Sequence, residues 1–331
     1  MKDIKKLKIY LEQRILSSDN VVIVPHKNPD FDAIASSLGL SLIARKFKKS
    51  SYIIVDDPIH KIESGVQTII EQTREKGFNI VDRERYLQLP KDDELLILTD
   101  VNKKNLIYLN DDIISRQKDI IIIDHHSEDL NTVPASYKFI DLTASSACEI
   151  LTKLLCAFKI KYDEDIANYL LAGIYLDTNK MMKNITSDTM KMVTKLLENK
   201  ASNDKVADFF SEDFISDRKV QDLVSNAEFF NYAVATVIGE EDREYTREEL
   251  AKAADYLLKF KIDAAFAIGK IEDDIVSISA RSKGKIDVGE IMQELNGGGN
   301  QCSAATKIEN CTPKEAGKQL TKVIRPTFYK K

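Results

Sequence analysis

Four continuous apolar runs restrict the fold of this chain more than any other feature of its sequence. The runs cover residues 21–24, 95–98, 120–123 and 170–176. Each is rich in Val, Ile or Leu, as expected of strands that are buried on both faces of a parallel sheet. The longer stretches between them, such as 34–47 and 144–158, carry apolar residues at helical spacing. This alternation predicts an open α/β sheet with helices on both faces.

Aspartate or histidine follows every one of these runs. In chain order they are His26, Asp30 and Asp32 after the first run, Asp100 after the second, Asp124, His125 and His126 after the third, and Asp177 after the fourth. A single Asp in such a place is usually a helix cap or a turn residue. Four such places in one chain favour another explanation, because the ligand site of an open α/β sheet lies outside the carboxyl ends of its strands.

The residue types of this group predict metal binding. Clustered carboxylates repel one another unless cations are present. Asp and His without a thiolate suit Mn²⁺, with Mg²⁺ or Fe²⁺ as alternatives, and two such ions about 3.5–4 Å apart are a common arrangement for phosphate-ester hydrolysis. We therefore predict a two-metal phosphoesterase site whose ligands are His26, Asp30, Asp32, Asp100, His125 and Asp177. The remaining histidine, His60, stands apart from these motifs.

The domain organisation follows from a change of pattern near residue 200. We expect a metal-binding domain over residues 1–200, a polar helical connector over 201–228 and a smaller α/β domain over 229–331. In the second domain Arg281 and Ser282 follow a predicted strand, and a guanidinium suits bidentate phosphate binding. The run Gly297, Gly298, Gly299, Asn300 could bring backbone N–H groups close to a ligand, although such a run is more often a plain turn.

Composition limits the partners. The 331 residues have a formal net charge of −5, whereas proteins that grip long nucleic acids usually show a basic face. The four cysteines include no Cys-x-x-Cys pair, which argues against a zinc ribbon. The first residues are charged throughout and show no apolar core of the kind found in signal peptides, and no apolar run reaches the length of a membrane helix. We expect a cytoplasmic protein, for which a small phosphate-bearing ligand is possible, and a homodimer is left open.

These motifs resemble the DHH phosphoesterase superfamily, named for the triplet found here at Asp124, His125 and His126. The second domain is similar to the DHH-associated domain. The stretches HKNPDFDAIASSLG, TASSACEI and ISARSKGKIDVGEIMQELNGGGN look most like the catalytic module of GdpP-type cyclic-di-AMP phosphodiesterases. The resemblance implies a larger parallel-sheet domain, a smaller α/β domain and an active-site cleft between them.

The resemblance also implies roles for single residues. One metal would be held by His26, Asp30 and Asp100, and the other by Asp32, Asp100, His125 and Asp177, so that Asp100 bridges the two. Asp124 would orient a ligand histidine, and His126 would face the substrate as a phosphate contact or proton donor. Phosphate and base would be bound by Arg281, Ser282, Gly297, Gly298, Gly299 and Asn300.

The implied activity is hydrolysis of cyclic-di-AMP to 5′-pApA by a two-metal-activated hydroxide. Alternatives are a short-oligoribonucleotide nuclease that also acts on 3′,5′-bisphosphate nucleotides, and a non-catalytic nucleotide sensor. A soluble pyrophosphatase ranks lower because few cations are available for its substrate. Two departures from the family pattern concern the substrate side. Asn300 stands where a histidine is usual, so we expect Asn300→His to improve kcat/KM, and residues 184–186 read Asn-Ile-Thr in place of Arg-Thr-Gly.

Overall fold

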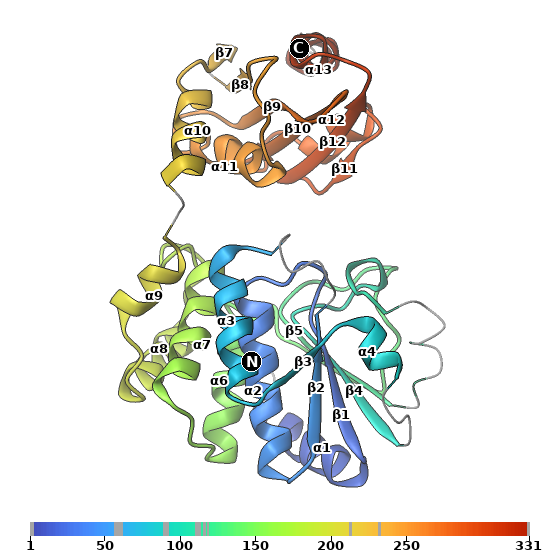
Figure 1. Cartoon of the computed structure of the whole chain (residues 1–331), viewed down its shortest axis with the longest axis vertical. Coiled ribbons are helices and arrows are strands. Elements are labelled where there is room, and N and C mark those ends of the chain that lie inside the picture. Colours follow the sequence, from blue (N-terminus) through green and yellow to red (C-terminus); the bar gives the residue numbers. More distant parts are fainter. Residues whose placement is uncertain are drawn as a thin grey trace. The chain divides into compact units, whose positions relative to one another are not determined.

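The chain divides into two compact units in a computed structural model, Met1–Ser211 and Glu212–Lys331, each with its own sheet (Figure 1). The division falls within the predicted connector. The structure describes residues 3–55, 62–88, 93–109, 114, 117, 119–211, 214–230 and 233–329, with side chains described as far as residue 324.

The sheet of the first unit is built from six parallel strands in the order β3-β2-β1-β4-β5-β6. The chain runs outward from β1 to β3, returns to the centre, and runs outward in the other direction from β4 to β6. Ligands of such doubly wound sheets bind where the order reverses, which is here between the carboxyl ends of β1 and β4. The strands are β1 (Asn20–Val24), β2 (Ser50–Ile54), β3 (Asn79–Val81), β4 (Glu94–Thr99), β5 (Ile120–Asp124) and β6 (Tyr137–Ile140).

Alternate residues of the central strands belong to two different cores. Ile23 and Ile97 lie in the core shared with the long helices, which gather on one face of the sheet in Figure 1. Val22 and Leu96 face the opposite side and pack with Tyr86 of α4 and with loop residues. Among the described residues this second face has only a short helix, so the expected helical cover is present mainly on one side. The helices are α1 (Ile4–Ser17), α2 (Phe31–Lys46), α3 (Ser64–Glu75), α4 (Arg83–Leu87), α6 (Ala147–Phe158), α7 (Glu164–Asp177), α8 (Ser187–Glu198) and α9 (Asn203–Phe209).

One predicted strand is wrong. The runs at 21–24, 95–98 and 120–123 are confirmed as β1, β4 and β5, but the run at 170–176 lies inside α7. Asp163 caps this helix by accepting a hydrogen bond from the N–H of Ile166 at 3.0 Å. The helix is buried on all sides over Ile166–Ile174, and a helix buried all round shows no amphipathic period by which to tell it from a buried strand.

The second unit has a mixed sheet in the order β11-β12-β10-β9-β8-β7, in which only β8 and β9 pair in parallel. Helices α10 and α11 pack on one face, and α12 and α13 pack on the other. Among the described helices of the whole chain, none combines the length and apolar composition needed to cross a bilayer. The elements are α10 (Phe214–Val224), β7 (Glu228–Phe230), β8 (Val234–Ile238), α11 (Arg247–Leu257), β9 (Ala264–Glu272), β10 (Ile275–Ser282), α12 (Val288–Gln293), β11 (Gly298–Gly299), β12 (Ser303–Glu309) and α13 (Pro313–Tyr329).

Candidate metal centre

The link between β1 and α2 supplies three of the predicted ligands. His26 places its Nδ1 2.8 Å from the carbonyl oxygen of Lys27, an arrangement that makes Nδ1 the donor and leaves Nε2 for a metal. Asp30 caps α2 by accepting a hydrogen bond from the N–H of Ala33 at 3.0 Å. Asp32 lies in the first turn of the same helix and is fully buried.

The carboxylate of Asp32 is held by another helix. Its two oxygens accept hydrogen bonds from the N–H groups of Ala147 and Cys148 at 2.7 Å each. These are the first residues of α6, so the negative charge lies at the positive end of that helix, where it is stabilised. Asp32 therefore keeps its position without requiring a cation.

Asp100 follows β4 in an unusual backbone conformation. Its φ is 56°, in the left-handed region that asparagine and aspartate tolerate better than other side chains that carry a Cβ. Its N–H donates to the carbonyl oxygen of Ile123 at 3.1 Å, which fixes the strand end against β5. The residue is 4% exposed.

Asp177 is the last residue of α7, and Gly173 allows that helix to approach the site. A Cβ at Gly173 would lie 2.9 Å from Asp32 Oδ1 and 2.5 Å from Cys148 Sγ. Any larger side chain would push α7 away from α2 and α6. Gly173 was not identified from the sequence, and the signal that could have found it is a glycine inside an otherwise apolar run, which often has a packing reason.

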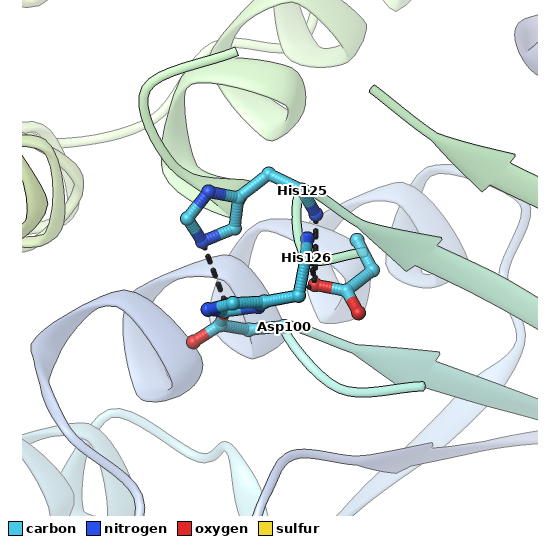
Figure 2. Close-up of side chains that lie close together, drawn as sticks. Asp100, His125 and His126 are labelled. Atoms are coloured by element: carbon cyan, nitrogen blue, oxygen red, sulfur yellow. Dashed lines mark hydrogen bonds and ion pairs between the residues drawn. The ribbon is translucent and has the colours of Figure 1, made fainter. Parts of the chain in front are cut away.

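The six predicted ligands form two neighbouring triads. His26, Asp30 and Asp100 place one donor atom each within 4.8 Å of one another, and so do Asp32, His125 and Asp177. His125 and Asp100 join the triads, with His125 Nε2 at 3.2 Å from Asp100 Oδ1. Figure 2 shows the His125 ring turned toward the Asp100 carboxylate, with His126 beside it. His125 Nε2 is also 3.1 Å from Asp177 Oδ2.

Negative charge dominates the electrostatics of the triads. Burial and the nearby charge of Asp177 raise the pKa of Asp32 to about 6. Burial and the charge of Asp32 raise the pKa of Asp100 well above its usual value. Burial opposes the charged form of His26, but Asp30 and Asp100 outweigh it and raise the pKa of His26 to about 10. Burial also opposes the charged form of His125, but the neighbouring carboxylates of Asp100 and Asp177 outweigh it and raise the pKa of His125 to about 11.

These groups fit divalent cations. Asp100 Oδ1 and His125 Nε2 are buried polar atoms that make no hydrogen bond of normal geometry, and buried polar atoms are otherwise almost always paired. Carboxylate oxygen and imidazole nitrogen are suitable donors for Mn²⁺, Mg²⁺ or Fe²⁺. Binding requires neutral imidazoles and ionised carboxylates, so a cation would displace the protons that these pKa values hold on the cluster.

Asp124 and His126 lie next to the triads. Asp124 is fully buried, and its Oδ1 accepts hydrogen bonds from the N–H of His125 at 2.7 Å and from His126 Nδ1 at 2.9 Å. Asp124 was predicted to orient a ligand histidine. It contacts the ligand His125 only through the main chain, and the imidazole ring that it holds is that of His126. The side chain of His126 is 55% exposed.

A cavity of about 600 Å³ opens beside the second triad. His125, His126 and Asp177 form one side of it, and the rest comes from two short segments of the first unit, residues 142–145 and 183–186. In the sequence, residues 143–145 stood out only for their likeness to a family pattern, and residues 184–186 only because they depart from it. Lys183 was not identified at all, because a surface lysine carries no signal of its own.

In the second unit, the residues predicted to bind substrate contact neighbouring residues of the same unit. Arg281 Nε donates to Asp255 Oδ2 of α11 at 3.3 Å. Gly297 and Gly299 are required by a close hairpin, since a Cβ at either would lie 2.4 Å from backbone atoms of β12. Ser282 donates its N–H to the carbonyl oxygen of Cys302 at 2.9 Å, which places it next to this hairpin. A Cβ at Gly298 would meet no atom within 4 Å.

Asn300 is a turn residue in the structure. Its Oδ1 accepts hydrogen bonds from the N–H groups of Cys302 and Ser303, both at 2.9 Å. Asparagine commonly closes turns in this way. The expectation that histidine at this position improves kcat/KM therefore loses its basis, because the side chain is already engaged. His60 lies outside the described residues.

Asp100→Asn is expected to abolish the thermal stabilisation that Mn²⁺ gives the wild-type chain. Asparagine keeps the size and tolerates the positive φ, but it removes the charge that both triads share. A ligand at about 100 times its Kd stabilises the folded state by about 2.7 kcal/mol, which is several degrees in Tm. The control is Asp119→Asn, because Asp119 is a buried carboxylate that pairs with Arg14 instead. An undiminished Mn²⁺ shift in Asp100→Asn would contradict the assignment.

Gly173→Ala is expected to weaken Mn²⁺ binding, because the added methyl group displaces α7 and its terminal Asp177. Overpacking of this kind destabilises by about 1–3 kcal/mol. Gly39→Ala is the matched control, since a Cβ there would meet Leu151 only at 3.4 Å and alanine favours a helix. Calorimetric titration of both variants with Mn²⁺ measures the effect. Equal affinities in the two variants would show that the close approach of α7 is not needed.

Asn300→His is expected to lower the stability of the second unit, because imidazole cannot accept both backbone hydrogen bonds. The loss is about 0.5–1.5 kcal/mol for each bond. Asn300→Asp should keep wild-type stability, since a carboxylate oxygen can accept both. Chemical denaturation of the two variants measures the difference. A histidine variant as stable as the wild type would restore the earlier interpretation of the loop.

Comparison with known proteins agrees with this architecture. The model of the DHH family, N-terminal domain, matches residues 20–174, and the model of the DHHA1 domain matches residues 230–329. The solved structure of an exopolyphosphatase-related protein from Bacteroides fragilis has the same fold, with a TM-score of 0.82 at 19% identity over 98% of this chain and 97% of that one.

Two curated relatives have named activities. The chain is 31% identical to the cyclic-di-AMP phosphodiesterase PdeA of Listeria monocytogenes over 95% of this chain and 48% of that protein. It is 27% identical to the bifunctional oligoribonuclease and PAP phosphatase NrnA of Mycoplasma genitalium over 88% of this chain and 89% of that protein. It spans about half the length of the cyclic-di-AMP phosphodiesterases that it matches. By its two successive domain matches and its fold, the chain belongs to the DHH family and joins an N-terminal DHH domain to a DHHA1 domain.

Proposed function

We propose that this chain is a divalent-metal-dependent phosphodiesterase that opens cyclic-di-AMP to linear 5′-pApA. The observation that carries the proposal is the pair of triads, because two donor sets joined through Asp100 and His125 suit two cations. The likeness to PdeA supports the choice of substrate. We take Mn²⁺ as the first choice of ion, with Mg²⁺ and Fe²⁺ as alternatives.

When bound, two such cations neutralise the phosphate and lower the pKa of a water molecule, which makes it a nucleophile near neutral pH. The chain must then place the phosphodiester against the triads and assist the leaving oxygen. His126 is suited to the second task. Asp124 holds its Nδ1, so Nε2 is the nitrogen left for a ligand in the cavity that His126 lines.

An imidazole that carries a proton on Nε2 can contact a phosphate oxygen or pass that proton to the 3′-oxygen that leaves. In the second unit, Arg281, Ser282 and the hairpin of Gly297, Gly298 and Gly299 stay our predicted phosphate and base contacts. Asn300 is retained in that group for its place at the end of the hairpin.

A second candidate is hydrolysis of short oligoribonucleotides and of 3′,5′-bisphosphate nucleotides. The observation in its favour is the match to NrnA, whose length the chain nearly spans. Both candidates use the same cluster and differ in which phosphate is presented to it. A nucleotide sensor without catalysis is the weakest candidate, since binding alone does not require six converging metal donors.

The test is a product analysis. The wild-type chain with Mn²⁺ is incubated separately with cyclic-di-AMP, cyclic-di-GMP, pApA and 3′-phosphoadenosine 5′-phosphate, and the products are separated by chromatography. We expect cyclic-di-AMP to give pApA as the first product with the highest kcat/KM of the four, and Asp100→Asn to be inactive on all of them.

Other results would point elsewhere. A higher kcat/KM on pApA or on the bisphosphate would replace the proposal with the second candidate. Tight binding of cyclic-di-AMP without any turnover would favour the sensor. Activity retained in Asp100→Asn would contradict the assignment of Asp100 to both triads.

A further inference from the structure

A buried carboxylate in the segment 143–150 has no part in the metal site. Glu149 lies in the first turn of α6 and is fully buried. Its Oε2 accepts hydrogen bonds from the N–H and the hydroxyl of Ser145, at 2.9 and 2.7 Å, and from the hydroxyl of Thr189 at 2.7 Å. Its Oε1 accepts one from Lys153 Nζ at 2.6 Å. A buried charge is tolerated only with such full pairing.

These partners belong to the two walls of the cavity beside the triads. Ser145 ends the first wall, formed by residues 142–145. Thr189 follows the second wall, formed by residues 183–186, and accepts a hydrogen bond from the N–H of Thr186 at 3.1 Å as part of the cap of α8. One oxygen of Glu149 therefore joins the two walls, although they lie about forty positions apart in the sequence.

The second wall depends on such a link because the chain before it is strained. Asn179, Lys180 and Met181 have φ values of 48°, 54° and 67°, and Asn184 has 54°. Consecutive left-handed residues other than glycine are unfavourable and persist only where their surroundings fix them. At the near end Thr178 accepts a hydrogen bond from the N–H of Met181 at 3.0 Å. At the far end the fixed point is Thr189 on Glu149.

The cavity suits a nucleotide in size and chemistry. Its volume of about 600 Å³ lies within the range of small-ligand sites. Lys183 offers a charge for phosphate, Thr143 and Asn184 offer hydrogen-bonding groups, and Leu142 and Ile185 offer exposed apolar surface that a base can cover.

We propose that Glu149 is a positioning residue, which sets the spacing of the two cavity walls for the nucleoside that flanks the scissile phosphate. It acts on substrate affinity and leaves the metals untouched. The inference rests on the proposed function in one respect, that the occupant of the cavity is a nucleotide. Burial opposes ionisation of Glu149, but Lys153 and the donors of Ser145 and Thr189 outweigh it and lower its pKa.

The test compares two variants that each remove one partner of Glu149. Thr189→Val keeps the shape of the side chain but deletes the donor at Oε2 and frees the second wall. Lys153→Met deletes the partner at Oε1, which lies in neither wall although it also pairs with Asp188 Oδ2 of α8 at 3.6 Å, and serves as the control for lost stability. Thr189→Ser restores the hydroxyl. Each variant is assayed with Mn²⁺ on cyclic-di-AMP and on bis(p-nitrophenyl) phosphate, a diester without a nucleoside.

We expect Thr189→Val to raise KM for cyclic-di-AMP about five-fold or more, as the loss of a buried hydrogen bond implies. Its kcat, its Mn²⁺-induced Tm shift and its kinetics on the small diester should stay close to wild type. Thr189→Ser should recover the KM. Lys153→Met should lower Tm and leave KM unchanged, because a change that only weakens the fold lowers the amount of active enzyme and not its affinity for the substrate.

Three results would overturn the inference. They are a KM raised equally by Lys153→Met, a loss of activity in Thr189→Val that is equal on both substrates, and a KM unchanged in Thr189→Val. A wild-type chain that cleaves the small diester but not cyclic-di-AMP would instead contradict the proposed substrate. In that case calorimetric titration with AMP decides, where weaker binding by Thr189→Val supports the positioning role and equal binding refutes it.

Discussion

Four carboxylates lie close enough to repel one another, and a different structural feature holds each of them in place. They belong to Asp30, Asp32, Asp100 and Asp177. Asp32 lies against the first N–H groups of α6, and Asp30 caps α2. Asp100 turns out of β4 in a left-handed conformation, and Asp177 reaches the site because Gly173 lets α7 come close. The doubly wound sheet therefore does more than bring acids together. It supplies fixed dipoles and close packing that hold the acids in place before any cation binds, although their repulsion still raises the pKa values of Asp32 and Asp100.

Much of this arrangement could be read from the sequence, because a parallel sheet sends every strand end to the same edge. The runs at 21–24, 95–98 and 120–123 predicted three neighbouring strands and the residues that follow them. Asp177 was expected at the site for the wrong reason, as the end of a strand. The helix signals were present in Asp163 and in the acidic pair Glu164 and Asp165, but a helix buried on all sides hides its period.

The rest of the site depends on contacts between distant parts of the chain. Arg281 meets Asp255, and Glu149 meets Thr189, forty positions away. No spacing in the sequence predicts such pairs. The same holds for Asn300, whose residue type suggests hydrogen bonding but does not say whether its oxygen faces a ligand or its own turn. The cavity walls are two loops without regular structure, which periodicity cannot locate.

The left-handed backbone at Asp100 limits how this family could lose its chemistry. A residue at position 100 must tolerate the left-handed backbone and must offer a carboxylate to the cations. Alanine meets neither requirement. Asparagine and glycine tolerate the backbone and lack only the carboxylate. Copies of this fold that have become pure binding proteins should therefore keep Asn or Gly at position 100, while positions such as His26, in ordinary backbone, drift more widely. The backbone torsion at one residue would therefore make Asn or Gly at that position a sequence marker of homologues that have lost catalysis.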